Sequence, residues 1–97
     1  MNKYESIFVL SALLEEEKLQ EIITKVKELI EASGQLEKMD EWGKRRLAYE
    51  IDDQKEGYYV FLHFTAEPTF PAELERIYKI TEGVLKYLII RRDEKSA

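Results

Sequence analysis

The sequence predicts an α+β fold in which two helices cover one face of a four-stranded antiparallel sheet. Three observations support this prediction. Two segments have helical periodicity, four have the alternation or apolar density of strands, and they follow the order strand, helix, strand, strand, helix, strand. Right-handed crossovers turn this order into the ferredoxin-like βαββαβ arrangement.

The first predicted strand and helix differ in their apolar period. Residues 3–10 alternate, with apolar groups on both sides, as is typical of a central strand. From Leu14 the spacing becomes helical, and the apolar positions of that face are Leu19, Ile22, Ile23, Val26 and Ile30. Three glutamates at 15–17 open the helix, where its dipole favours anions, and Gly34 is expected to end it.

The middle of the chain predicts a hairpin with one irregular strand. Residues 36–51 are extended, but their alternation is regular only after Gly43, which indicates a bulge or bend near that glycine. Residues 52–57 are expected to form a polar turn. Residues 58–66 form a second strand that alternates strongly.

The last third predicts a helix and a final strand. Thr69 is expected to cap the helix, with Pro71 in its first turn and Gly83 at its end. One face of this helix carries Phe70, Leu74, Ile77, Tyr78 and Thr81. Residues 84–92 are rich in Ile and Leu and form the last strand, and residues 94–97 are expected to be a flexible tail.

Length and composition indicate a single ferredoxin-like domain over residues 1–97. No run of about 18 apolar residues is present, so no membrane span is expected. The start of the chain, MNKYESIFVL, lacks the pattern of a signal peptide, and cysteine is absent, so a cytoplasmic protein is expected. The formal net charge of −5 argues against a generally nucleic-acid-binding surface, although the cations are concentrated locally.

Catalytic, metal and cofactor sites are not expected. There is one histidine, His63, and no nucleophile with a base beside it, and the four glycines stand singly rather than in a phosphate loop. An enzyme of the acylphosphatase type would need an anion-binding loop after the first strand. That loop reads SALLEEE, which would repel phosphate, and the one asparagine of the chain is Asn2. The sequence therefore predicts a protein that is not an enzyme, binds no small-molecule substrate and has no cofactor.

The face of the sheet away from the helices is predicted to bind a protein. The parity of the strands places Tyr59, Phe61 and His63 outward, together with Ile7 and Val9 of the first strand. The residues expected to contact the partner are Trp42, Tyr59, Phe61, His63, Leu88 and Ile90. The RNA-recognition motif has the same topology, but its basic and glycine signature is missing from GYYVFLHFTA, so base stacking is the weaker interpretation.

The stretch EWGKRRLAYEI places three cations, at 44–46, between a glycine and an alternating strand. Charges of this kind can simply protect a strand edge from aggregation. Three cations in succession exceed that need. On their own they favour contact with RNA phosphate about as much as protection of the strand edge.

Several segments resemble the bacterial small-subunit ribosomal protein S-six family. The similar segments are KYESIFVL, WGKRRLAYEI, GYYVFLHF and EGVLKYLIIRRDE, in the right order from Asn2 to Glu94. Family members usually have a proline after the tyrosine of the second segment, where this chain has Glu50.

The resemblance implies a structural protein of the small-subunit platform. Such proteins bind the central domain of 16S rRNA together with ribosomal protein S-eighteen. The positions expected to bind RNA are Lys3, Tyr4, Lys44, Arg45, Arg46, Lys86, Arg91 and Arg92. Which of the three hairpin cations meets phosphate is left open, and a ferredoxin-like domain that dimerises through its sheet to sense a ligand or bind protein remains the alternative.

Overall fold

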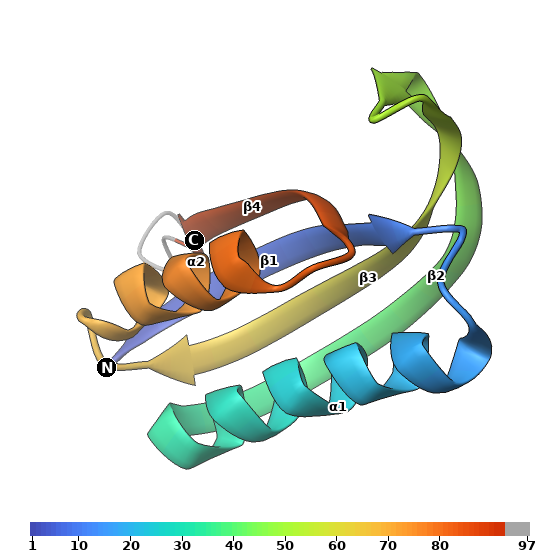
Figure 1. Cartoon of the computed structure of the whole chain (residues 1–97). Coiled ribbons are helices and arrows are strands. Elements are labelled where there is room, and N and C mark those ends of the chain that lie inside the picture. The colour runs from blue at the N-terminus through green and yellow to red at the C-terminus, as the bar shows by residue number, and fades with distance from the viewer. Residues whose placement is uncertain (93–97) are drawn as a thin grey trace.

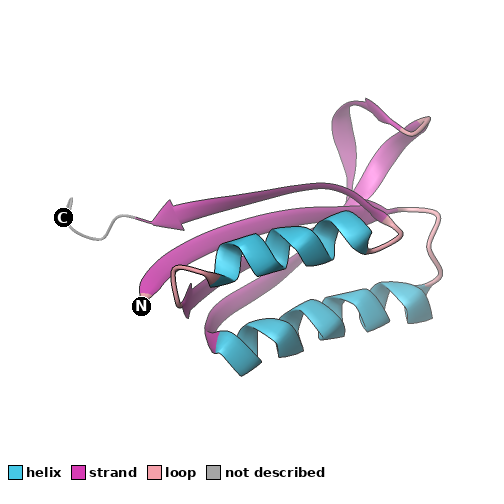
Figure 2. Cartoon of the chain, turned by 60° about the vertical axis from the view of Figure 1, so that its left-hand side comes forward, coloured by secondary structure: helices cyan, strands magenta, loops and turns pink. Residues whose placement is uncertain are grey.

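The computed structural model describes residues 1–92, and the expected flexible tail at 94–97 lies outside the described residues. The elements are β1 (Asn2–Ser11), α1 (Glu16–Ser33), β2 (Gly34–Ile51), β3 (Gln54–Ala66), α2 (Phe70–Ile80) and β4 (Val84–Arg92). The strands form one antiparallel sheet in the order β2-β3-β1-β4. Both helices lie on the same face of it (Figures 1 and 2). The predicted ferredoxin-like α+β fold is confirmed.

The core lies between the helices and the covered face of the sheet. In β3 the residues Val60, Leu62 and Phe64 are fully buried, and they alternate with half-buried Tyr59 and Phe61 on the other side. Alternate strand residues point to opposite faces, so the predicted parity of this strand is confirmed. The other core residues include Phe8 and Leu10 of β1, the predicted apolar stripe of α1, and Phe70, Leu74 and Tyr78 of α2.

The predicted irregularity of β2 is present at Gly43. The pairing of β2 with β3 shifts register between Leu36 and Lys38 and again between Glu41 and Gly43. Gly43 has a φ of 79°, and a Cβ added there would meet nothing within 4 Å. The glycine is therefore needed for its backbone conformation rather than for space.

The hairpin turn is shorter than expected. Pairing continues to Ile51 opposite Gln54, which leaves a turn of two residues, Asp52 and Asp53, with φ values of 49° and 63°. Two successive positive φ values are the requirement of a tight hairpin turn, and aspartate tolerates them better than most residues. The predicted polar turn at 52–57 is thus wrong beyond its first two residues, because β3 continues through its polar beginning.

The helix ends agree only partly with the sequence prediction. Thr69 lies at the N-cap of α2 as expected, but it makes no side-chain capping hydrogen bond. The N–H of Phe70 donates instead to the carbonyl of Glu67 at 3.0 Å. The helix ends at Ile80, three residues before Gly83. Gly34 does end α1, and it must lack a side chain because a Cβ would lie 2.0 Å from the Thr65 carbonyl oxygen.

The β2–β3 hairpin extends past the helices at the end of the sheet away from the N-terminus (Figure 1). Val9 has the parity of the open face, yet it is buried. Its side chain lies against Gly57 of β3, and Leu47 of β2 lies near the same glycine and is also buried. Residue 9 was expected to belong to an exposed patch, and the structure corrects this because the hairpin supplies a small apolar cluster of its own.

Candidate functional site

The open face of the sheet is organised in rows across three strands. Residues paired in antiparallel register point to the same side of a sheet. From the hairpin end to the other end, the rows across β3, β1 and β4 are Tyr59–Val9–Lys86, Phe61–Ile7–Leu88, His63–Glu5–Ile90 and Thr65–Lys3–Arg92. The residues expected to bind a partner therefore share one surface, on which Leu88 and Ile90 are about half exposed.

An aromatic ladder, which we define as Trp42, Tyr59, Phe61 and His63, crosses this surface from β2 onto β3. The Trp42 ring is nearly parallel to Phe61, with centroids 5.5 Å apart, and to Tyr59, at 6.4 Å. The His63 ring lies 4.8 Å from Phe61 at a tilt. Trp42 remains 43% exposed although it stacks on two rings. A large, partly exposed and already oriented aromatic group is typical of an interface anchor.

Arg45 completes the ladder on the β2 side. Its guanidinium carbon lies 5.9 Å from the centroid of the Trp42 ring, and its Nε donates to the Trp42 carbonyl oxygen at 3.4 Å. Arg46 lies elsewhere, in a hollow shared with Leu13 and Asp53 between the hairpin and the loop after β1. The adjacent arginines thus serve different surfaces.

A polar network joins the last two rows. His63 Nδ1 lies 3.1 Å from Nη1 of Arg92, and His63 Nε2 lies 3.5 Å from Oε1 of Glu5. Because a guanidinium can only donate, Nδ1 accepts, and the neutral ring then carries its proton on Nε2, toward Glu5. Arg92 is also 3.7 Å from Glu37, which accepts a 2.6 Å hydrogen bond from Thr65. An expected RNA-binding residue and an expected partner-binding residue are therefore in direct contact.

The residues expected to bind RNA fall into two groups. The first lies where β1 begins and β4 ends, and it comprises Lys3, Tyr4, Arg91 and Arg92. Arg91 is exposed, and its Nη2 donates to Asn2 Oδ1 at 3.4 Å. Tyr4 differs from the others because it is only 5% exposed and its ring stacks on Phe64, with centroids 5.5 Å apart.

The second group surrounds the hairpin and comprises Lys44, Arg45, Arg46 and Lys86, all exposed. The Lys86 Nζ lies 5.2 Å from the ring centroid of Tyr49, which ties β4 to the hairpin. On the open face, Lys86 lies in the row nearest the hairpin, and Lys3 and Arg92 lie in the row at the other end of the sheet. Arg91 pairs with Tyr4 and has the parity of the covered face. Cations of the open face therefore lie at both ends of its apolar rows.

Sequence reasoning missed three carboxylates, two of them on this face and one, Glu41, on the side of the sheet that faces α1. Glu5 and Glu37 hold the network around Arg92, and Glu41 accepts a 2.7 Å hydrogen bond from the Tyr58 hydroxyl. That hydrogen bond, together with partial burial and the charge of Glu41, raises the pKa of Tyr58 to about 12. A charged residue in the middle of a central strand, as Glu5 is, was the one available signal.

Two negative findings apply to the part of the chain that the structure describes. Within residues 1–92 no three acidic or histidine side chains gather as a metal site would require. No helix in that range is both long enough and apolar enough to cross a membrane.

Comparisons with known proteins agree with this arrangement. The family model described as Ribosomal protein S6 matches residues 3–91. Small ribosomal subunit protein bS6 of Thermoanaerobacter pseudethanolicus is 52% identical over 95 residues, which cover 97% of this chain and all of that protein. The bS6 of Alkaliphilus oremlandii is 46% identical over 94 residues, with the same coverage.

The solved structure of 30S ribosomal protein S6 from Thermotoga maritima superposes with a TM-score of 0.89 at 31% identity, over 94% of this chain and 87% of that one. Sequence and structure thus give the same assignment. The chain belongs to the ribosomal protein S6 family, that is, S-six, whose members are structural proteins of the small ribosomal subunit in the cytoplasm and are not enzymes.

Proposed function

We propose that the chain binds the central domain of 16S rRNA jointly with ribosomal protein S-eighteen. The observation that carries the proposal is the layout of the open face, where an aromatic and apolar centre lies between two basic ends. The centre has the composition of a protein interface, and the ends have the composition of phosphate contacts. Membership of the ribosomal protein S6 family supports both the RNA contact and the protein contact.

The protein partner would cover the aromatic ladder together with Leu88 and Ile90. Truncating a stacked aromatic at the centre of an interface is typically costly, because water is excluded from its whole surroundings. The acidic groups Glu5 and Glu37 border this area, and the chain has a formal net charge of −5. A basic partner would be electrostatically complementary to such a surface.

RNA would contact the two basic groups. Lys3 and Arg91 at one end, and Lys44 and Arg46 at the other, are exposed cations on strands or on the hairpin. Arg92 is the weakest candidate of the first group, since Glu37 already offsets part of its charge. For Tyr4, whose ring is in the core, the role is limited to its outer edge and its hydroxyl, which accepts from Asn2 Nδ2 at 3.2 Å.

The packing of Trp42 argues for protein rather than nucleobases on the ladder. In a sheet that stacks bases, the aromatic faces must be accessible. Here Phe61 and Tyr59 are already stacked against the Trp42 ring. The joint mechanism follows from this division: a partner on the ladder fixes the sheet and its own cations, and so lowers the ordering cost of RNA docking.

The test is reconstitution from purified components. The chain, S-eighteen and a central-domain fragment of 16S RNA would be mixed in pairs and together, and complex mass would be measured by light scattering after size exclusion. We expect a complex of the two proteins that binds the RNA far more tightly than the chain alone. A stable homodimer that excludes S-eighteen would favour the sheet-dimerising alternative instead.

A further inference from the structure

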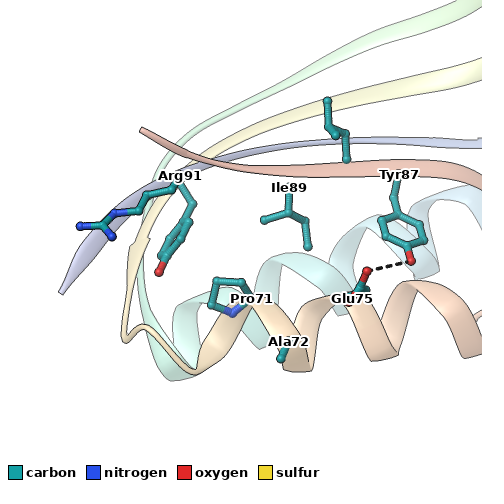
Figure 3. Close-up of a pocket in the computed structure, with 8 residues that line it drawn as sticks. Pro71, Ala72, Glu75, Tyr87, Ile89 and Arg91 are labelled. Carbon is teal, nitrogen blue, oxygen red and sulfur yellow. Dashed lines mark hydrogen bonds between the residues drawn. The ribbon is translucent and has the colours of Figure 1, made fainter. Parts of the chain in front are cut away.

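A groove of about 530 Å³ lies between α2 and the edge strand β4, on the helix side of the sheet, and Arg91 of the first basic group lines it. Figure 3 shows Pro71 and Ala72 on the helix, with Ile89 on the strand pointing toward them. Arg91 lies at one end of the groove, and Glu75 and Tyr87 lie at the other. Its volume falls in the range of ligand sites, roughly 300–1,000 Å³.

The sequence of α2 explains why the groove exists. Ala72 and Pro71 are short, so the first turn of the helix leaves space over the strand, whereas Tyr78 further along packs on Tyr87 with ring centroids 5.2 Å apart. Ile89 is consequently only half buried, although it has the parity of the covered face. The result is a flat apolar strip with open space above it.

The end of the groove at Tyr87 and Glu75 carries an oriented hydrogen-bond acceptor. The Tyr87 hydroxyl donates to Oε2 of Glu75 at 3.2 Å, which fixes the carboxylate (Figure 3). Desolvation, followed by the charge and the hydrogen bond of Glu75, raises the pKa of Tyr87, whose phenol is in any case protonated at neutral pH. A carboxylate has about four lone-pair sites, and most of them remain open to a ligand.

The opposite end of the groove carries a cation. Arg91 is exposed and makes one 3.4 Å contact with Asn2, which leaves several of its five N–H donors for an anion. Tyr87 and Arg91 are four residues apart on β4, about 13 Å. The cation and the carboxylate are therefore far enough apart to contact different parts of one ligand.

We propose that this groove holds one unpaired guanosine, with the phosphate on Arg91, the base against Ile89 and Pro71, and the Watson–Crick edge on Glu75. Guanine is the base whose Watson–Crick edge presents two adjacent donors, N1–H and N2–H, to a two-oxygen acceptor. Adenine, cytosine and uracil each place an acceptor beside their donor, which the carboxylate would repel. The inference rests on the proposed RNA-binding function and adds a nucleotide class to it.

The size and charge of the groove favour a nucleotide over a protein segment. Eight residues line it, whereas a stable protein interface uses roughly 20–30 residues a side. Its polar groups are also separated by sign, with the cation and the carboxylate at opposite ends (Figure 3). Sequence-specific RNA recognition commonly takes splayed, unpaired bases by their Watson–Crick edges.

The test uses free nucleotides and the intact chain. Methyl and aromatic NMR signals of Ile89 and Tyr87 would be followed during titration with GMP, IMP, AMP, CMP and UMP, all as 5′-monophosphates. We expect GMP to shift these signals and to bind about tenfold more tightly than AMP, in line with a two-bond base contact. IMP, which lacks the N2 amine, should fall between them.

Three variants separate the role of the carboxylate from the role of the cation. Glu75→Gln should bring GMP and AMP within about twofold of each other, because an amide offers a single acceptor. Arg91→Gln should weaken all five nucleotides alike, since phosphate contacts carry no base information. Glu73→Gln, on the same helix but outside the groove, is the matched control and should behave as the unmodified chain does.

Equal shifts from all nucleotides, no shift at millimolar GMP, or a GMP preference that survives Glu75→Gln would each overturn the inference. So would protection of Ile89 by S-eighteen without RNA, which would make the groove a protein contact. Reconstitution of the ternary complex judges the proposed function separately: an intact complex with no response to GMP removes the guanosine site alone. A GMP-selective groove without a ternary complex would remove the joint function alone.

Discussion

The two faces of the same sheet carry different kinds of chemistry. On the face under the helices, Phe8, Val60, Leu62 and Phe64 are completely buried, and a buried polar pair, Ser6 and Tyr78, is joined by a 2.8 Å hydrogen bond. On the open face the rows alternate apolar residues with charges, and Leu88 and Ile90 are half exposed. Because side chains alternate along a strand, one sequence can satisfy folding on one side and binding on the other.

The polar groups of the two faces differ in the same way. Ser6 and Tyr78 satisfy each other and offer nothing to a ligand. His63, Glu5, Arg92 and Glu37 form a network at the surface, where the groups are only partly buried. Substitutions in the core under the helices should therefore change stability, and substitutions on the open face should change binding.

The largest effect is expected on the covered face. Phe8→Ala removes a fully buried ring that packs on Tyr78, with centroids 5.2 Å apart. The free energy of unfolding should fall by about 3–5 kcal/mol. Urea unfolding followed by circular dichroism measures the loss, and a loss below about 1 kcal/mol would mean that this face is not the core.

The next effect is expected on the aromatic ladder. The double substitution Tyr59→Ala and Phe61→Ala should weaken partner binding by roughly 2–4 kcal/mol, the range of aromatic anchors. It also removes the support of Trp42, so some stability is lost, but less than for Phe8→Ala. Calorimetry with S-eighteen measures the first quantity and urea unfolding the second. If the double variant unfolds as readily as Phe8→Ala, the faces are not separated as described.

The buried tyrosine predicts a pH dependence. Burial raises the pKa of Tyr78, so the folded chain keeps a neutral phenol while the unfolded chain ionises near its ordinary pKa of about 10. The stabilisation is therefore complete below that pH and is lost above it, by up to about 1.4 kcal/mol per pH unit. Tyr78→Phe should make the alkaline limb less steep, and at pH 7 it should cost about 1–2 kcal/mol by leaving Ser6 without its partner.

Tyr58 provides a comparison with Tyr78. Its pKa is also raised, to about 12, chiefly by its hydrogen bond to Glu41 rather than by burial. Tyr58→Phe should change the alkaline limb less than Tyr78→Phe, because solvent screens a group so near the surface. Unfolding curves at pH values between 8 and 11 measure both, and equal slopes for the two variants would contradict the assigned environments.

The fold was predictable because its signals are local. The helical stripe of α1 and the alternation of β3 determine which residues face the core, and both predictions were confirmed. The hairpin turn was misplaced because the polar residues that follow Asp53 are typical of a turn, although the pairing of Ile51 with Gln54 starts β3 there. Tertiary pairing overrode local composition.

The candidate site was predictable only as a set of residue types. Parity gave the shared face, but nothing in the sequence indicated that Trp42 would lie on Phe61, since a bulge in β2 controls that contact. The pairing of His63 with Arg92, 29 residues apart, depends on register across three strands. Distances of this kind follow from the assembled sheet rather than from any local pattern.

The smallest effect on stability, and the sharpest test of the proposed RNA contact, is expected at the hairpin. Arg46 is exposed and lines a hollow away from the aromatic ladder, so Arg46→Ala should change stability by less than about 0.5 kcal/mol. If it meets phosphate in the complex with S-eighteen, RNA affinity should fall and the salt dependence should lose about one unit of slope. Lys55→Ala, in the same hollow but not expected to contact RNA, is the matched control. RNA affinity across a salt series measures the slope, with thermal melting alongside.

If the salt slope and the RNA affinity of Arg46→Ala are both unchanged, Arg46 is a charge that protects the β2 edge. If the melting temperature falls while the salt slope is unchanged, Arg46 has a structural role.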